Sequence, residues 1–185
     1  MRELPIYDVA IVGFGPVGAM LANLLARRGL AVAVVERTAA VYDKPRAISI
    51  DHEALRILQA VGLSDHIDAS MAPHNGTHFL GVDGELIKAF DPMPPPYPLG
   101  WIPNVTFVQP ELEQALREKL AAYDNVDVFL SATGVTLAQD PTVVSLVARR
   151  DDGGEFTLRA RYLVGCDGAN SFVRKQIGAG LEDLA

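Results

Sequence analysis

The stretch that most constrains the fold of this 185-residue chain is "VAIVGFGPVGAMLANLLA", residues 9–26. A short apolar run ends at Gly13, and Gly15 and Gly18 complete the spacing G-x-G-x-x-G before a series of helix-forming residues. In a strand–turn–helix unit, Gly13 permits a tight turn, Gly15 lets the backbone approach a pyrophosphate, and Gly18 lets the helix pack closely on the strand. Free N–H groups at the helix start would then hold the phosphate charge.

The flanking residues predict one complete βαβ unit around this turn. Ile6–Val12 is a short Val- and Ile-rich run typical of a buried parallel strand, and Pro16–Arg28 is predicted to be a helix. Gly29 is placed as its left-handed C-terminal cap. Ala31–Glu36 then forms a second buried strand, and strand, helix and strand fit within about thirty residues.

The acid that ends this second strand indicates which nucleotide the turn would hold. Glu36 follows the glycines by about twenty residues, where a carboxylate binds ribose hydroxyls. Such a carboxylate disfavours a 2′-phosphate, although the neighbouring Arg37 weakens that inference. The turn is therefore predicted to bind FAD or NAD rather than NADP.

The remainder of the chain predicts an α/β fold with a small antiparallel unit inserted into it. Helices are expected at Asp51–Val61 and over residues 109–123, where Glu113 and Arg117 are spaced i,i+4. Asp83-Gly84 and residues 151–154 are turn signals, each between two short alternating strands. In the second hairpin one face should point inward, namely Val144, Leu146, Ala148, Phe156, Leu158 and Ala160.

A third apolar strand, Tyr162–Cys166, runs into Asp167 and then a helix beginning near Asn170 or Ser171. Ligands of open parallel sheets lie beyond the carboxyl ends of the strands, where Asp167 falls. An aspartate in a strand-to-helix turn can equally be an N-cap. The two interpretations are compatible.

Composition narrows the class of ligand. A net charge of −7, with scattered Lys and Arg, argues against nucleic-acid or anionic-membrane partners and favours a small molecule. The single cysteine, Cys166, excludes an intrachain disulfide and fits a cytoplasmic location. The four histidines have no metal-ligand spacing, so no metal site is expected. Neither a signal peptide nor a membrane span is predicted, and the oligomeric state is not indicated.

Three blocks in order carry a family resemblance: "VAIVGFGPVGAMLANLLARRGLAVAVVER", "KPRAISIDHEALRILQAVGL" and "LVGCDGANSFVRK". Together they resemble the class A flavoprotein aromatic hydroxylases, the family of para-hydroxybenzoate and phenol hydroxylases. The middle block and "FVQPELEQAL" look most like the 3-(3-hydroxyphenyl)propionate hydroxylases of that family. The resemblance implies a Rossmann-like FAD-binding domain of the glutathione-reductase type.

The resemblance also implies a set of cofactor contacts. Arg46 would lie near the pyrophosphate and flavin, Gln109 would reach the ribityl region, and Val135 would meet the adenine through its backbone. Asp167 would serve FAD and a transient NAD(P)H. The implied cofactor-binding residues are Gly13, Gly15, Pro16, Val17, Gly18, Glu36, Arg37, Arg46, Gln109, Val135 and Asp167.

The implied reaction is hydroxylation of a phenolic ring such as 3-(3-hydroxyphenyl)propionate, in the catabolism of aromatic compounds. NADH or NADPH would reduce FAD, and O2 would react through a flavin C4a-hydroperoxide; no residue is singled out as the catalytic base. The family's second flavin motif is not visible, so residues 1–185 are expected to be the N-terminal part of the FAD-binding domain, without the substrate domain and inactive alone. The alternatives are an NAD-dependent dehydrogenase and an inactive FAD-binding fragment.

Overall fold

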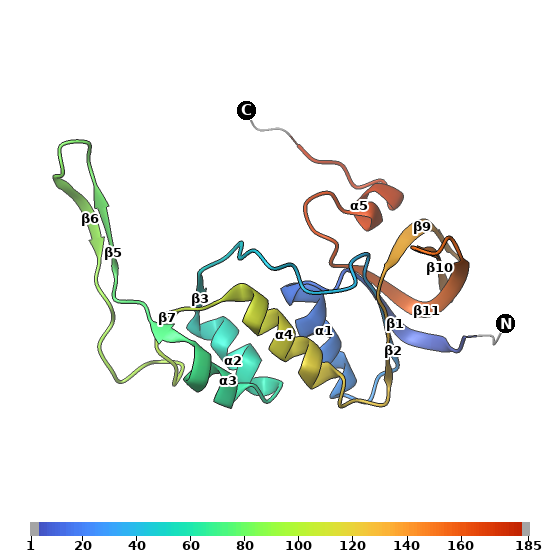
Figure 1. Cartoon of the computed structure of the whole chain (residues 1–185), viewed down its shortest axis with the longest axis horizontal. Coiled ribbons are helices and arrows are strands. Elements are labelled where there is room, and N and C mark those ends of the chain that lie inside the picture. The colour runs from blue at the N-terminus through green and yellow to red at the C-terminus, as the bar shows by residue number, and fades with distance from the viewer. Residues whose placement is uncertain (1–3, 183–185) are drawn as a thin grey trace. The chain divides into compact units, whose positions relative to one another are not determined.

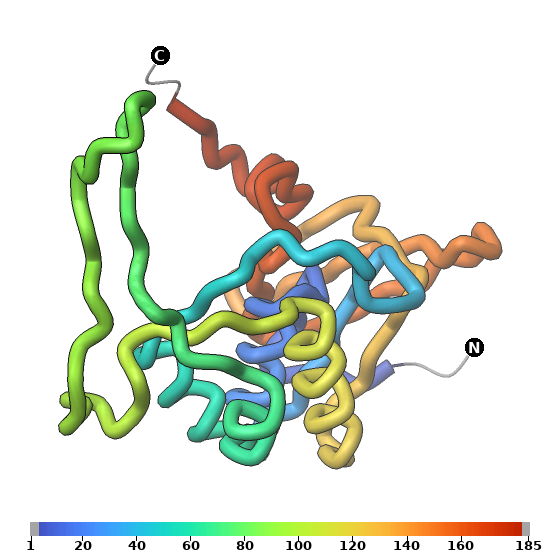
Figure 2. Tube along the Cα trace, turned by 60° about the vertical axis from the view of Figure 1, so that its left-hand side comes forward, coloured from blue at the N-terminus to red at the C-terminus, as the bar shows by residue number. Residues whose placement is uncertain are grey.

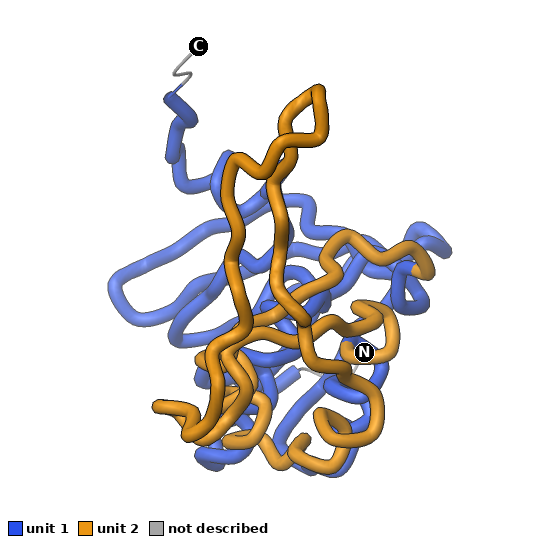
Figure 3. Tube along the Cα trace, turned by 90° about the vertical axis from the view of Figure 1, so that its left-hand side faces the viewer, with its two compact units in different colours: residues 1–42, 113–185 blue, residues 43–112 orange. Residues whose placement is uncertain are grey.

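The computed structural model describes residues 4–182. The chain divides into two compact units (Figure 3): unit 1 comprises residues 1–42 and 113–185, and unit 2 comprises residues 43–112. None of the helices within residues 4–182 is long and apolar enough to cross a membrane.

Unit 1 is built on a six-stranded sheet in the order β8-β2-β1-β11-β10-β9. Figure 1 labels β2, β1, β11, β10 and β9 of this sheet. Neighbouring strands pair in parallel from β8 to β11, and β11, β10 and β9 pair antiparallel. The expected mixed α/β fold is therefore confirmed. The strands are β1 (Ile6–Val12), β2 (Val32–Val35), β8 (Val126–Phe129), β9 (Ala132–Gln139), β10 (Val144–Arg150) and β11 (Glu155–Gly165).

The glycine-rich turn links β1 to the helix α1 (Pro16–Ala26), and β2 follows. The predicted βαβ unit is thus confirmed, although α1 ends two residues earlier than expected. Arg27 is the C-cap residue, and Gly29 has a positive φ of +78°, as a left-handed cap requires. A short helix, α5 (Phe172–Gln176), follows β11.

The strand β11 corrects one expectation. The second hairpin and the strand Tyr162–Cys166 were expected as separate elements, but they form one continuous eleven-residue strand. Its first half pairs with β10, from Glu155 to Ala160, while Arg159 to Gly165 pair with β1. No glycine or proline interrupts the run, so nothing ends the strand where the neighbour changes.

Unit 2 holds an antiparallel insertion, but of the two predicted hairpins only the first lies in it, because the second, β10–β11, belongs to the six-stranded sheet of unit 1. Unit 2 has a three-stranded sheet, β3-β7-β4, and a separate β5–β6 hairpin, seen as two long neighbouring tubes in Figure 2. Gly84 has φ +82° in the hairpin turn, as expected. The elements are β3 (Ser49–Asp51), α2 (His52–Ala60), α3 (Ser64–Ser70), β4 (Ala72–Pro73), β5 (Thr77–Leu80), β6 (Leu86–Phe90) and β7 (Asn104–Thr106).

The helices expected at Asp51–Val61 and over residues 109–123 are confirmed, and both are shorter than predicted. The side chain of Asp51 caps α2 by accepting from the N–H of Ala54 at 2.9 Å. The helix α4 (Gln109–Leu120) begins in unit 2 and continues in unit 1, with Leu112, Leu116 and Leu120 buried along one face.

The hydrophobic core of unit 1 is packed against its six-stranded sheet. The predicted inward face of the second hairpin is confirmed, because Leu146, Ala148, Leu158 and Ala160 are at most 1% exposed. Two side-chain hydrogen bonds also join elements of this unit. Asn23 of α1 donates its side-chain amide to the carbonyl of Leu116 in α4 at 2.9 Å. Tyr7 of β1 donates its hydroxyl to Asp127 of β8 at 2.6 Å.

Candidate cofactor-binding site

The glycine turn has the steric limits that its spacing predicts. Gly13 has φ +102°, and a Cβ there would meet the carbonyl group of Cys166 and lie 2.9 Å from the Cα of Asp167. A Cβ on Gly18 would strike the carbonyl oxygen of Gly13. A Cβ on Gly15, in contrast, would meet nothing within 4 Å. Gly13 and Gly18 therefore serve packing, whereas Gly15 borders open space.

That open side adjoins the start of α1. Gly15 is the N-cap residue and supplies no capping side chain, and Pro16 occupies the first helical turn. The first N–H groups of a helix have no partner within it and attract anions. Because Gly15 has no Cβ, a pyrophosphate can approach the backbone there, and the uncapped N–H groups at the start of α1 can bind its charge. A dinucleotide cofactor requires both features.

Glu36 lies beside this turn, immediately after β2. Its backbone N–H donates to the carbonyl of Phe129, and its carbonyl accepts from Ala132. Its Oε2 accepts from the N–H of Phe14 at 2.7 Å, and its Oε1 accepts from both the N–H and the hydroxyl of Thr38 at 2.9 Å. A carboxylate has about four acceptor positions, so one remains on Oε2 for a ribose hydroxyl.

These contacts keep the Glu36 carboxyl ionised. Burial raises its pKa, but the hydrogen bonds from Phe14 and Thr38 and the charge of Arg117 outweigh burial, so the pKa is lowered. An ionised carboxylate only accepts hydrogen bonds, which suits the hydroxyl donors of a ribose and repels a 2′-phosphate. The charge state thus agrees with the nucleotide preference predicted from the sequence.

Arg117 belongs to the same constellation, although sequence reasoning treated it only as the partner of Glu113 in a helical pair. Its Nη2 donates to the carbonyl oxygen of Phe14 at 2.8 Å, and its guanidinium lies 4.5 Å from the centre of the Phe14 ring. A signal was present in the sequence. Glu113 and Arg117 each follow a leucine of the apolar stripe at helical spacing, so both fall beside the buried face of α4.

Gln109 and Arg46 are brought together within unit 2. The side chain of Gln109 is 5% exposed, and its Oε1 accepts from the N–H groups of Arg46 and Ala47, both at 2.9 Å. Gln109 therefore fixes the backbone of the segment that carries Arg46, whose side chain is exposed. Their contacts with pyrophosphate, flavin and ribityl chain stay predictions.

The N-cap residue of α5 is Ser171, whose hydroxyl accepts from the N–H of Arg174 at 3.0 Å, so the prediction of Asp167 as N-cap is wrong. Asp167 lies four residues earlier and still binds the first N–H groups of the helix. Its Oδ2 accepts from the N–H groups of Phe172 and Val173 at 2.6 and 3.1 Å, and its Oδ1 accepts from the hydroxyl of Ser171. Its Cα also lies against the turn at Gly13. The residue is thus placed next to the nucleotide turn, and its service to FAD and NAD(P)H remains a prediction.

Val135 lies at an irregularity of the ladder between β9 and β10. Thr136 pairs with Val147 and Gly134 with Ala148, so Val135 between them has no partner across the ladder. A bulged residue has backbone groups outside the regular pairing, which suits the predicted backbone contact with adenine. Val135 also lines a shallow hollow with Thr133, Gly134, Arg149, Arg150, Asp151 and Gly153.

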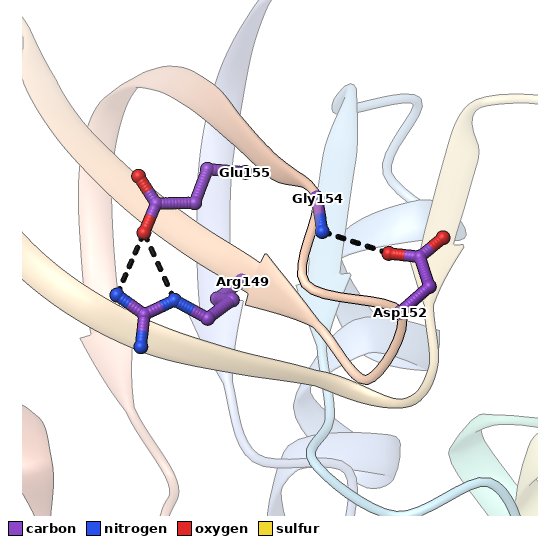
Figure 4. Close-up of polar contacts among 4 residues, drawn as sticks. All are labelled: Arg149, Asp152, Gly154 and Glu155. Carbon is purple, nitrogen blue, oxygen red and sulfur yellow. Dashed lines mark hydrogen bonds and ion pairs between the residues drawn. The ribbon is translucent and has the colours of Figure 1, made fainter.

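The turn beside this hollow is fixed by polar contacts (Figure 4). Arg149 binds one carboxylate oxygen of Glu155 through Nε and Nη2, at 2.9 and 2.8 Å. The N–H of Gly154 donates to Asp152 at 2.8 Å. These contacts close the β10–β11 hairpin and hold one wall of the hollow.

Comparisons with known proteins agree with this geometry. Residues 6–184 match the family described as FAD binding domain. The chain is 40% identical over 175 residues to a 3-(3-hydroxy-phenyl)propionate/3-hydroxycinnamic acid hydroxylase of Comamonas testosteroni, covering 95% of this chain and 29% of that protein. It is 37% identical to the enzyme of that name from Escherichia coli (strain SMS-3-5 / SECEC), covering 95% and 31%. The chain therefore spans about 30% of these relatives' length.

Two solved structures that superpose on this chain are monooxygenases. The p-nitrophenol 4-monooxygenase PnpA from Pseudomonas putida DLL-E4 superposes with a TM-score of 0.82 at 27% identity, covering 94% of this chain and 44% of that one. The flavin-dependent monooxygenase PieE, solved in complex with FAD and substrate, has a TM-score of 0.82 at 26% identity, covering 96% and 33%.

Proposed function

This chain belongs to the family of FAD-binding domains, and from that premise we propose that it is the nucleotide-binding portion of an FAD-dependent monooxygenase that hydroxylates aromatic rings. Its similarity to hydroxylases and monooxygenases over at least 94% of its length supports the proposal. The proposal applies to the whole protein of which such a portion is part, and residues 1–185 are its N-terminal FAD-binding part.

The observation that carries the proposal is the pairing of the open turn at Gly15 with the fixed carboxylate of Glu36. The turn offers uncapped N–H groups to a pyrophosphate, and Glu36 retains an acceptor position for a ribose hydroxyl. Both features bind the ADP half of a dinucleotide. That half is common to FAD and NAD, and the family decides in favour of FAD.

Bound FAD, reduced by NADH or NADPH, supplies the activation of O2 that ring hydroxylation needs. The residues of this chain would bind and orient it. Gly15 and the start of α1 would hold the pyrophosphate, and Glu36 would accept from the adenosine ribose. The bulged backbone at Val135 would meet the adenine, while Gln109 and Arg46 would reach the ribityl and pyrophosphate regions. Asp167 is proposed to border both FAD and the transient NAD(P)H.

The proposed substrate is a phenol such as 3-(3-hydroxyphenyl)propionate, because relatives at 37–40% identity carry that compound in their names. The identity covers the cofactor-binding part, and a small change in a substrate pocket shifts discrimination by only about 1–3 kcal/mol. The phenol class is therefore the proposal, with this compound as its first member. We propose a cytoplasmic location, which the single cysteine supports.

Flavin retention tests the proposal directly. The purified chain is mixed with FAD, dialysed, and its absorption spectrum compared with that of free FAD. We expect retained flavin bands shifted by the protein, weaker retention in Glu36→Ala, and no comparable retention of NAD⁺. A chain that circular dichroism shows to be folded but that holds no flavin would contradict the assignment of FAD to this portion. For the activity, O2 uptake and NAD(P)H oxidation would be measured with the phenol in the whole protein.

A further inference from the structure

We propose that Arg117 is a positioning residue of the nucleotide site: its guanidinium fixes the peptide between Phe14 and Gly15 and, through the glycine turn, the carboxylate of Glu36. The ligand it serves is the ADP half of the dinucleotide, pyrophosphate together with ribose. The inference rests on the proposed function, because it assigns a role within that same site.

The geometry places Phe14 between two opposite charges. Its carbonyl oxygen accepts from Nη2 of Arg117 at 2.8 Å, and its N–H donates to Oε2 of Glu36 at 2.7 Å. The Phe14 ring is 3% exposed and lies under the guanidinium at 4.5 Å. Both peptide groups of the residue in the middle of the turn are therefore held by charged side chains of the chain itself.

This arrangement determines how the turn faces a ligand. A trans peptide is planar, so its C=O and N–H point in opposite directions. The hydrogen bond from Arg117 to the carbonyl of Phe14 thus directs the N–H of Gly15 away from the guanidinium. That N–H belongs to the residue that borders open space, so its direction is set before any nucleotide binds. Such preorganisation saves ordering entropy on binding.

Electrostatics supports a role beyond helix packing. Burial lowers the pKa of Arg117 and outweighs the charges of Glu36 and of Glu113, which is 2% exposed, so the pKa is lowered overall and placing a cation here has a cost. Among the described residues, the Nε–H of Arg117 is buried without an acceptor. A leucine or methionine here would avoid that unpaired donor, so packing alone does not account for an arginine. The contacts with Phe14 and the nearby charges of Glu36 and Glu113 do.

The test compares Arg117→Met, Arg117→Lys and the matched control Arg27→Met, which removes an exposed cation elsewhere in unit 1. FAD binding is measured by flavin fluorescence and ADP binding by calorimetry. We expect Arg117→Met to weaken FAD and ADP alike by roughly tenfold or more, because a hydrogen bond to a charged group is lost. Arg117→Lys should recover part of the loss, and Arg27→Met should match the wild type.

Two further measurements separate positioning from a general loss of structure. Combined with Glu36→Gln, the Arg117→Met loss in ADP affinity should be smaller than alone, because the two residues act on one turn. In the ligand-free chain, NMR should show a higher pKa of the Glu36 carboxyl in Arg117→Met, and faster exchange of the Phe14 amide, which donates to that carboxylate. Circular dichroism confirms that each variant is folded.

A folded Arg117→Met chain that binds FAD and ADP within twofold of the wild type would overturn the inference. So would losses that simply add to those of Glu36→Gln. Failure of the wild-type chain to bind either ligand would instead refute the proposed function for this portion. In that event the ligand-free measurements still decide, since an unchanged Glu36 pKa and unchanged exchange of the Phe14 amide would show that Arg117 does not order the turn.

Discussion

At the scale of single residues, the three glycines of the turn have different structural roles. A methyl group at Gly13 would collide with backbone and impose a φ of +102° on an alanine, whereas one at Gly15 would meet nothing. We therefore expect Gly13→Ala to lower the free energy of unfolding by about 2–4 kcal/mol. Gly15→Ala should stay within about 1 kcal/mol of the wild type and still lose FAD affinity. Urea unfolding and flavin titration check both, and a Gly15→Ala chain with normal affinity would contradict the open-side assignment.

Glu36 predicts a pH dependence of stability. Its pKa is lowered in the folded chain, so its contribution is present above the unfolded value of about 4.3 and is lost as the pH falls through the folded value. Glu36→Gln should cost roughly 1 kcal/mol at pH 7, since glutamine keeps one acceptor oxygen. The gap between wild type and variant should narrow toward pH 3. Urea unfolding at several pH values measures it, and a constant gap would show that the charge makes no contribution.

Residue types and spacing were enough to predict Gly13, Gly15, Gly18 and Glu36 as one group, because that motif is local and its distances are fixed by one βαβ unit. Arg117 was not predicted, because it reaches Phe14 from 103 positions away. No local pattern reports such a contact. The only signal in the sequence was that the charged pair Glu113 and Arg117 lies beside the apolar stripe of α4.

At the scale of elements, Tyr7 of β1 reaches across the sheet to Asp127 of β8, with β2 between them. Burial raises the pKa of the Tyr7 phenol, and the hydrogen bond and charge of Asp127 raise it further. Its contribution to stability is therefore full below the unfolded pKa of about 10 and is lost as the pH rises through the folded value. Tyr7→Phe should cost about 1 kcal/mol at pH 7 and make stability fall less steeply above pH 10.

Spectrophotometric titration of the five tyrosines checks this prediction. The wild type should show one phenol that ionises only as the chain unfolds in alkali, and Tyr7→Phe should lack that step. Tyr162→Phe is the control, because Tyr162 is 70% exposed and has no part in the contact. Persistence of the late step in Tyr7→Phe would assign it to another tyrosine.

The types of the predicted elements followed from periodicity, whereas short elements such as α3 and β8 were not predicted and the neighbours of a strand could not be. Alternation correctly predicted the buried face of the second hairpin. It could not show that the same strand continues past Ala160 to pair with β1, because pairing partners are chosen by tertiary packing rather than by local pattern. Likewise, the bulge at Val135 depends on register, which a strand sequence alone does not specify.

At the scale of the whole molecule, the FAD assignment makes a prediction that does not depend on any single contact. A ligand that binds only the folded chain stabilises it by RT ln(1 + [L]/Kd), about 2.7 kcal/mol at one hundred times Kd. For a chain of this size that corresponds to a rise of roughly 5–10 °C in Tm. The rise should grow with the logarithm of the FAD concentration.

Because ADP carries the pyrophosphate and ribose that the turn and Glu36 are proposed to hold, saturating ADP should also raise the Tm of the wild type, measured by differential scanning calorimetry. Gly15→Ala and Glu36→Gln should each reduce both rises, whereas Arg27→Met should leave them unchanged. A rise with FAD but none with ADP would place the main contacts on the flavin half and remove the turn from the site. A rise with neither ligand in the folded wild type would contradict the assignment of FAD to this portion of the protein.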